Sequence, residues 1–191
     1  MEWVSNVGKI IILRIGHRAV RDKRITTHVT LTARGLGADG IMICGVKDTR
    51  ISNSVDRVVE QWGGEFSIDF CPSWKTAIAQ WLERGGEVIH LTMYGLPLLE
   101  VLEQIRKSEK DKLVVIGAEK VPGEVYELAT YNVSVSNQPI SEVSALGVFL
   151  DRYFEGKELS KEFKGHKIRI LPQRAGKKTA PNHFSPSTKE D

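Results

Sequence analysis

The chain has few of the features that mark secreted or membrane-spanning proteins. No apolar run in its 191 residues approaches the ~20 residues that a membrane-spanning helix needs. The first residues, MEWVSNVGK, lack the basic start and apolar centre of a secretory signal. Only Cys44 and Cys71 are present, too few for a disulfide framework, so we expect a reducing, cytoplasmic location. Both cysteines lie in apolar surroundings, and we expect buried free thiols rather than a bridge.

Several motifs that would identify an enzyme are also missing. There is no phosphate-binding P-loop, zinc-ligand spacing or nucleophile elbow, and the five histidines show no ligand spacing, so we expect no metal. A formal G-x-G-x-x-G occurs at Gly35, Gly37 and Gly40. A dinucleotide-binding copy follows a strand and opens a helix, whereas this one closes a helix and precedes a strand. We interpret it as the end of a helix.

Basic residues are unevenly distributed, although the net charge is only +3. The segment 9–24 holds six Lys and Arg residues against one Asp, and 157–191 holds nine against four acidic residues. Local basic stretches on a nearly neutral body favour a polyanionic partner such as RNA. A solvated loop and tail would have the same composition, so charge alone does not decide between the two.

A regular alternation of apolar runs and amphipathic segments is what the chain does contain. The strands are rich in Ile and Val with little polar alternation, which predicts an α/β fold with a parallel sheet and helices on both faces. The expected helix caps are Thr27, Ser52 or Ser54, Ser73 and Ser141. Strands are expected at 10–15, 40–44, 66–70, 87–93, 113–116 and 132–135, and helices at 27–36, 52–62, 73–82, 97–105, 122–128 and 141–150.

The C-terminal part of the sequence has a different character. Two short β-like runs flank Lys164-Gly165 within 161–172, which predicts a hairpin. Beyond Pro172 the chain is polar and basic, without periodicity, as is typical of a disordered tail. We therefore expect a main domain at 1–156, a β-hairpin extension at 157–174 and a disordered basic tail at 175–191.

Ligands of parallel sheets bind at the carboxyl ends of the strands, so the loops there are the candidate site. The first loop, 16–28, carries arginines that can grip phosphate through paired donors, although an ordinary surface loop would look the same. Three later loops, at 91–97, 117–122 and 136–142, combine glycine, amides and helix starts. They could converge on one ligand, while each alone also fits ordinary turn and capping chemistry.

Four segments together resemble the SPOUT superfamily of methyltransferases: LRIGHRAVRDKRITTHV (13–29), ARGLGADGI (33–41), VIGAEKVPGEVY (115–126) and NVSVSNQPISEVSALGVFLDR (132–152). More closely, they resemble the archaeal tRNA cytidine 2'-O-methyltransferases that modify T-loop position fifty-six. The resemblance covers roughly 13–174.

The resemblance implies a deep trefoil knot near the C-terminal part of the sheet, homodimers, and a tRNA substrate in the cytoplasm. It also implies that the cofactor S-adenosyl-L-methionine binds in a bent pose within the three later loops. The terminal hairpin is expected to add to the dimer contact. Carried over residue by residue, the cofactor cradle is Leu91, Gly117, Ala118, Glu119, Lys120, Val121, Val135, Ser136, Asn137, Gln138, Pro139, Ile140, Ser141 and Glu142.

The arginine common to the wider ribose-methylating branch is absent from its usual helix, so we expect the basic loop to do its work. Arg18 or Arg21 is the candidate to stabilise the developing alkoxide. His28 or His17 is a candidate base. We assign RNA contacts to Arg14, His17, Lys23 and Arg24. A competing interpretation is that these side chains only hold RNA and the proton leaves to water.

Two rival functions remain at this point. One is a non-catalytic domain that binds RNA or senses a ligand, which needs the basic loop but not the cofactor cradle. The other is methylation of a different RNA site by the same chemistry.

Overall fold

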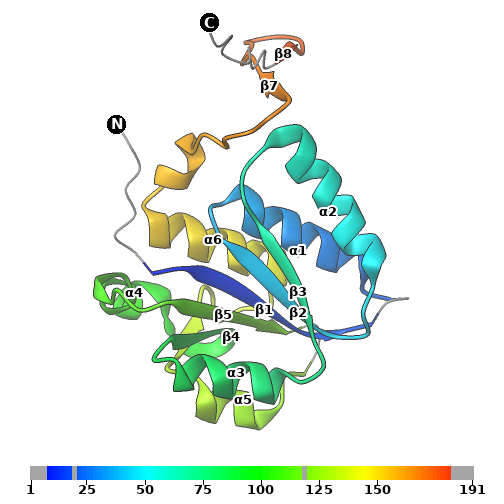
Figure 1. The fold of residues 1–191 in the computed structure, drawn as a ribbon. Helices are drawn as coiled ribbons and strands as arrows, with labels where there is room; N and C mark the ends of the chain where they lie inside the picture. The colour runs from blue at the N-terminus through cyan, green and yellow to red at the C-terminus, as the bar shows by residue number, and fades with distance from the viewer. Residues whose placement is uncertain (1–7, 19–20, 118–119, 182–191) are drawn as a thin grey trace, which may run out of the picture.

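Six parallel strands form one sheet with helices on both faces, as expected (Figure 1). The structure is a computed structural model that describes residues 8–18, 21–117 and 120–181. The strands of the sheet are β1 (Ile10–His17), β2 (Gly40–Gly45), β3 (Ser67–Cys71), β4 (Glu87–Pro97), β5 (Lys112–Gly117) and β6 (Tyr131–Ser134). The helices are α1 (Lys23–Gly35), α2 (Thr49–Trp62), α3 (Trp74–Glu83), α4 (Leu98–Lys107), α5 (Gly123–Leu128), α6 (Glu142–Phe154) and the short 3₁₀ turn η1 (Lys157–Ser160).

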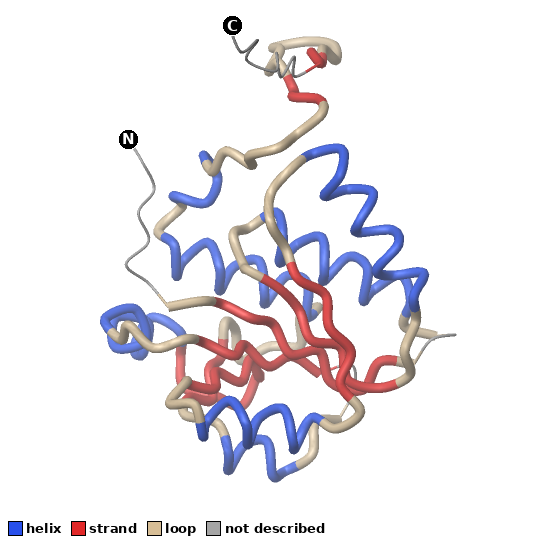
Figure 2. Tube along the Cα trace, viewed as in Figure 1, coloured by secondary structure: helices blue, strands red, loops and turns tan. Residues whose placement is uncertain are grey.

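Helices cover both faces of the sheet (Figure 2), and one apolar core on each face holds the layers together. Strand side chains alternate between faces, so Ile10 and Ile12 of β1 enter one core while Leu13 and Ile15 enter the other. The first core includes residues of α1, α2, α4 and α6, and the second includes residues of α3 and α5. Because both faces are covered, the strands need continuous apolar runs, which is the pattern that the sequence shows.

The strand order is β3-β2-β1-β5-β4-β6, and every pairing within it is parallel. All six carboxyl ends therefore lie along one edge, and β1, β5, β4 and β6 are consecutive neighbours there. The basic loop after β1 is thereby placed beside the loops that follow β5, β4 and β6.

Two helices begin earlier than expected. Helix α1 begins at Lys23, with Asp22 at the N-cap position, so the second half of the expected basic loop is helical. The segment is charged, but it is amphipathic and buries Thr26, Val29 and Thr30, which is enough to form a helix against the sheet. Asp48 rather than Ser52 or Ser54 caps α2, because its carboxylate accepts a hydrogen bond from the Arg50 backbone N–H.

Other local predictions are confirmed. Ser73 and Ser141 cap α3 and α6 by accepting hydrogen bonds from backbone N–H groups of the first turn. The glycine-rich segment is the end of α1: Leu36 is the C-cap and Gly37 has a φ of 93°. A positive φ favours glycine, so this glycine serves the turn rather than a dinucleotide.

The prediction of free thiols was wrong. Cys44 and Cys71 form a disulfide with a Cα–Cα distance of 4.7 Å. The two residues are direct register partners on the neighbouring strands β2 and β3. Sequence alone does not reveal this pairing, because 27 residues separate the two cysteines.

The C-terminal segment leaves the main body after η1 and ends in an antiparallel pair, β7 (Ile168–Ile170) and β8 (Thr179–Pro181) (Figure 1). A hairpin is present, but its strands differ from the expected runs within 161–172, and β8 lies in the segment expected to be disordered. The reason is that the first run is held elsewhere: the Gly64 N–H donates to the Lys164 carbonyl, and the Arg34 guanidinium lies 4.7 Å from the centroid of the Phe163 ring. Residues 182–191 lie outside the described parts.

No helix in the described ranges is both long and apolar enough to cross a membrane. Within the same ranges, no group of three or more His, Cys, Asp or Glu side chains is arranged to hold a metal ion.

Candidate active site

The three segments that were predicted as later loops meet at the carboxyl edge of the sheet. The first of them, 91–97, is not a loop after β4 but the bulged end of the strand itself, which runs to Pro97. The three segments surround a pocket of about 260 Å³ between the ends of β4, β5 and β6. Asn137 ties two of them together by donating from Nδ2 to the Met93 carbonyl over 2.8 Å. The residues lining the pocket are Leu91, Thr92, Met93, Ile116, Gly117, Val121, Val135, Ser136, Gln138, Pro139, Ile140, Glu142 and Ala145. The convergence expected for the cofactor cradle is thus present in the structure.

Nine of the fourteen cradle residues predicted from the sequence line this pocket: Leu91, Gly117, Val121, Val135, Ser136, Gln138, Pro139, Ile140 and Glu142. Asn137 joins two loops instead, Ser141 caps α6, and Lys120 lines a neighbouring pocket. Ala118 and Glu119 lie outside the described residues.

Four lining residues were not predicted from the sequence: Thr92, Met93, Ile116 and Ala145. Thr92 and Met93 directly follow Leu91 in a loop that the sequence analysis singled out. Ala145 lies one helical turn after Glu142, a spacing that places both on the same side of α6. Helical spacing alone would therefore have pointed to Ala145.

The bulge within β4 depends on close backbone packing against β6. Both Leu91 and Leu96 of β4 pair with Val133 of β6, so residues 92–95 bulge out of the strand towards the pocket. Gly95 closes this bulge. A Cβ at Gly95 would lie 2.5 Å from the Asn132 carbonyl carbon and from the Val133 nitrogen, which are backbone atoms that cannot turn aside.

Replacing Gly95 by alanine should therefore deform the pocket. We expect Gly95→Ala to lower the free energy of unfolding by about 1–3 kcal/mol, the usual cost of overpacking. We also expect it to weaken binding of S-adenosylmethionine, the cofactor that the family resemblance implies. Chemical denaturation and calorimetric titration measure the two effects. Gly123→Ala, in the nearby α5, is the matched control, because a Cβ there meets nothing within 4 Å. If Gly95→Ala and Gly123→Ala have equal unfolding free energies and equal ligand affinities, the close packing at the bulge is not important.

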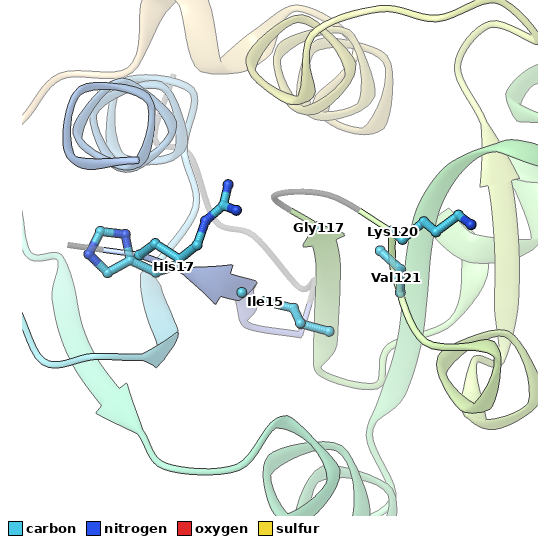
Figure 3. Close-up of a pocket in the computed structure, with 7 residues that line it drawn as sticks. Ile15, His17, Gly117, Lys120 and Val121 are labelled. Carbon is cyan, nitrogen blue, oxygen red and sulfur yellow. The ribbon is translucent and has the colours of Figure 1, made fainter. Parts of the chain in front are cut away.

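A second pocket, also of about 260 Å³, adjoins the first at the ends of β1 and β5. Gly117 and Val121 line both pockets, so the two cavities share a wall. Figure 3 shows the end of β1, with Ile15 and His17, beside Gly117 at the end of β5 and near Lys120 and Val121. Ile15, Gly16, His17, Arg18 and Lys120 complete the lining. The basic side chains place positive charge here, whereas none of the described residues that line the first pocket is basic.

Arg18 is fixed within this second pocket by Asp22. Its Nε lies 3.0 Å from Oδ2 of Asp22 and its Nη2 lies 3.2 Å from Oδ1, while the Arg18 backbone N–H donates to the same carboxylate. The hydrogen bond from Arg18 is the main reason that the pKa of Asp22 lies below its ordinary value. The Arg18 side chain keeps 40% of its surface exposed, so it can still contact a substrate.

His17 is buried, with 2% of its surface exposed, which contradicts its predicted contact with RNA. Its ring turns away from Gly117 (Figure 3), and Nδ1 lies 2.9 Å from the Thr26 hydroxyl of α1. Burial lowers the pKa of His17, so the imidazole is neutral at pH 7. His17 therefore joins the end of β1 to α1.

Arg14 was also predicted to bind RNA, and the structure contradicts this. The side chain is fully buried beneath the pockets, where it donates to the Gly117 carbonyl at 2.7 Å and to Oε1 of Glu142 at 2.9 Å. Its place in the apolar run IIILRI signalled this, because every second residue of a strand lies on the same face. Arg14 therefore shares the face of Ile10 and Ile12, which is the α6 side of the sheet.

The remaining basic candidates lie outside both pockets. Arg21 precedes α1 and is exposed, as are Arg24 and His28 on that helix. Lys23 is the first residue of α1. Within the chain, the structure therefore brings neither Arg21 nor His28, both predicted as catalytic, to either pocket.

Comparison with protein families gives a specific match. The family model described as "tRNA ribose 2'-O-methyltransferase, aTrm56" matches residues 62–180, more than half of the chain. The chain belongs to this family.

Relatives of this ribose methyltransferase family match almost the whole chain. A protein of Thermococcus kodakarensis named tRNA (cytidine(56)-2'-O)-methyltransferase is 55% identical over 172 residues, which are 88% of this chain and 95% of that protein. A protein of the same name from Methanopyrus kandleri is 51% identical over 170 residues, covering 89% of this chain and 95% of its own length.

Solved structures share the fold of this aTrm56 family member at low sequence identity. A structure titled RNA 2'-O ribose methyltransferase aligns with a TM-score of 0.59 at 14% identity, covering 80% of this chain and 58% of that one. The methyltransferase AviRb from Streptomyces viridochromogenes, in complex with AdoMet, aligns with a TM-score of 0.55 at 15% identity, again covering 80% and 58%. These similarities show that the fold is that of the SpoU and TrmH methyltransferases.

Proposed function

We propose that the chain transfers a methyl group from S-adenosylmethionine to the ribose 2'-hydroxyl of cytidine 56 in the T-loop of tRNA. The observation that carries this proposal is the pair of pockets sharing Gly117 and Val121. A methyl transfer needs donor and acceptor in line and in contact, which two adjoining cavities provide. The names of the Thermococcus and Methanopyrus relatives supply the reaction and the nucleotide.

The first pocket fits the methyl donor. Its lining is mainly apolar and small, with backbone amides and the side chains of Ser136 and Gln138 available for hydrogen bonds to an adenosine and an amino acid. Residues of the β4 bulge and of the loops after β5 and β6 would hold the donor there. When bound, S-adenosylmethionine supplies an activated methyl group on a sulfonium.

The second pocket fits the acceptor nucleotide. Arg18 and Lys120 place positive charge where a ribose oxygen gains negative charge as it loses its proton. Arginine is a poor base, so the role of Arg18 is to stabilise that oxygen and orient the adjacent phosphate. Arg21, Lys23 and Arg24 begin the adjoining helix and are proposed to contact the phosphates of the tRNA.

We also propose that the chain carries the trefoil knot of SPOUT methyltransferases, with residues 135–141 passing through the loop of the preceding strands. Two features support this: β4 lies between β5 and β6, so the β5–β6 connection crosses it, and Asn137 contacts Met93. A homodimer in the cytoplasm is proposed from the family resemblance. The exposed apolar side chains Tyr94, Leu96 and Leu99 beside the pocket are compatible with a subunit contact.

Methylation of an unmodified tRNA transcript tests the proposed function. We expect a single 2'-O-methyl group at cytidine 56 in the presence of S-adenosylmethionine, mapped by mass spectrometry of nuclease fragments. A transcript with a 2'-deoxycytidine at that position is the matched control and should accept no methyl group. Methylation at another nucleotide would replace the substrate assignment. RNA binding without S-adenosylmethionine binding would favour a non-catalytic RNA-binding domain.

A further inference from the structure

Glu142 is the only charged residue among those lining the first pocket in the described part of the chain. It is the first residue of α6, and its side chain keeps 26% of its surface exposed. The neighbouring pocket carries Arg18 and Lys120 instead. The two cavities therefore differ in sign: one carboxylate lines the donor side, and basic groups line the acceptor side.

Arg14 holds this carboxylate in place from behind. Its guanidinium is fully buried and donates from Nη2 to Oε1 of Glu142 and from Nη1 to the Gly117 carbonyl. Burial lowers the pKa of Arg14, and Glu142 opposes the shift, but an arginine remains protonated. The pair is therefore a dipole whose positive end is buried and whose negative end lies at the pocket.

A purely structural ion pair would not need this arrangement. A buried ion pair often adds little stability compared with apolar residues of similar size, because both charges lose hydration. Among the described residues, only Arg14 donates a hydrogen bond to the Glu142 carboxylate, through Oε1, and Glu142 also lines the pocket. This arrangement favours a function in recognising a charge on the ligand.

The ligand of the proposed reaction changes its charge at one atom. The methyl donor carries a positive sulfonium, and the product left after transfer carries a neutral thioether at the same position. Both keep the same adenosine, ammonium and carboxylate groups. A single negative charge close to the sulfur would therefore attract the donor more strongly than the product.

We propose that Glu142, positioned by Arg14, recognises the positive charge of the sulfonium and so selects the methyl donor over its neutral product. This inference rests on the proposed function and adds a specificity-determining residue to it. Loss of the charge during methyl transfer weakens the contact with Glu142, which promotes release of the product after each turnover.

Calorimetric titration with three ligands tests the proposal without measuring catalysis. The ligands are S-adenosylmethionine, S-adenosylhomocysteine, and sinefungin, in which an amine-bearing carbon replaces the sulfonium. For Glu142→Gln we expect the affinity for the two ligands charged at this position to fall about tenfold relative to S-adenosylhomocysteine. Glu124→Gln is the matched control: Glu124 lies in the first turn of α5 and pairs with Lys75, outside both pockets. Its ligand preference should equal that of the unmodified protein.

Glu142→Gln leaves the charge of Arg14 buried beside a neutral partner, so this variant could misfold. A second variant keeps the test valid in that case. Arg14→Met combined with Glu142→Leu removes both charges and should lose the same preference. An unchanged preference in either folded variant overturns the proposal, as does an equal loss of affinity for all three ligands, which would indicate recognition of a group that they share. Failure of the unmodified protein to bind S-adenosylmethionine would instead contradict the proposed function.

Discussion

Replacing Arg18 by alanine is expected to lower kcat by roughly 100-fold, the usual effect of removing one donor that stabilises a developing oxyanion. Arg18 lines the acceptor pocket, and Asp22 fixes its guanidinium through two hydrogen bonds. The dissociation constant for S-adenosylmethionine should stay unchanged, because Arg18 does not line the donor pocket. Single-turnover methylation of tRNA and calorimetric titration measure the two quantities.

A matched control and a conservative variant sharpen this test. Arg57→Ala removes an exposed arginine from α2, away from both pockets, and should leave kcat unaltered. Arg18→Lys keeps the charge but loses the planar pair of donors, so it should restore only part of the rate. If Arg18→Ala weakens tRNA binding but leaves the single-turnover rate intact, Arg18 holds RNA and has no part in the chemistry.

Removal of the disulfide is expected to have the largest effect on stability. The Cys44–Cys71 bond closes a loop across 27 positions, which corresponds to about 3–4 kcal/mol of loop-closure entropy in the unfolded chain. We expect Cys44→Ser with Cys71→Ser to lower Tm by roughly 9 °C for a chain of this length. Thermal unfolding followed by circular dichroism measures the shift.

The same unfolding experiment contains its own control. A reducing agent should lower the Tm of the unmodified protein towards that of the double variant, and should leave the double variant unaffected. Equal Tm values for the oxidised protein and the double variant would show that the bond contributes nothing to stability. Activity should fall less than stability, because neither Cys44 of β2 nor Cys71 of β3 lines a pocket.

Much of the fold was predictable because its signals are local. The runs around β1, β2 and β5 are apolar and β-branched, and Ser73 and Ser141 mark helix starts through hydrogen bonds to their own first turns. The prediction of α1 failed at its beginning. Its charged start looked like a loop, and only packing against the sheet shows that Thr26 and Val29 provide a buried face.

The candidate site was predictable in its loops and less so in its basic side chains. Parallel strands end at one edge, so the loops after β4, β5 and β6 were expected to meet, and nine predicted residues line the pocket. Arg14 and His17 were assigned to RNA because a sequence does not show whether a basic side chain is exposed or buried. Both are buried, since the alternation of β1 turns Arg14 towards α6 and the end of the strand turns His17 towards α1.

Three things follow from the sequence by itself: the succession of strands and helices along the chain, the edge of the sheet where the site lies, and the family resemblance. Each depends on patterns within a few residues or on long shared segments. Only the tertiary structure decided that Cys44 pairs with Cys71, that Arg14 holds Glu142, and that the two pockets share a wall. The physical reason is that these contacts join residues from 27 to 128 positions apart. The order of the strands in the sheet decides which of these distant residues come into contact, and no local propensity encodes that order.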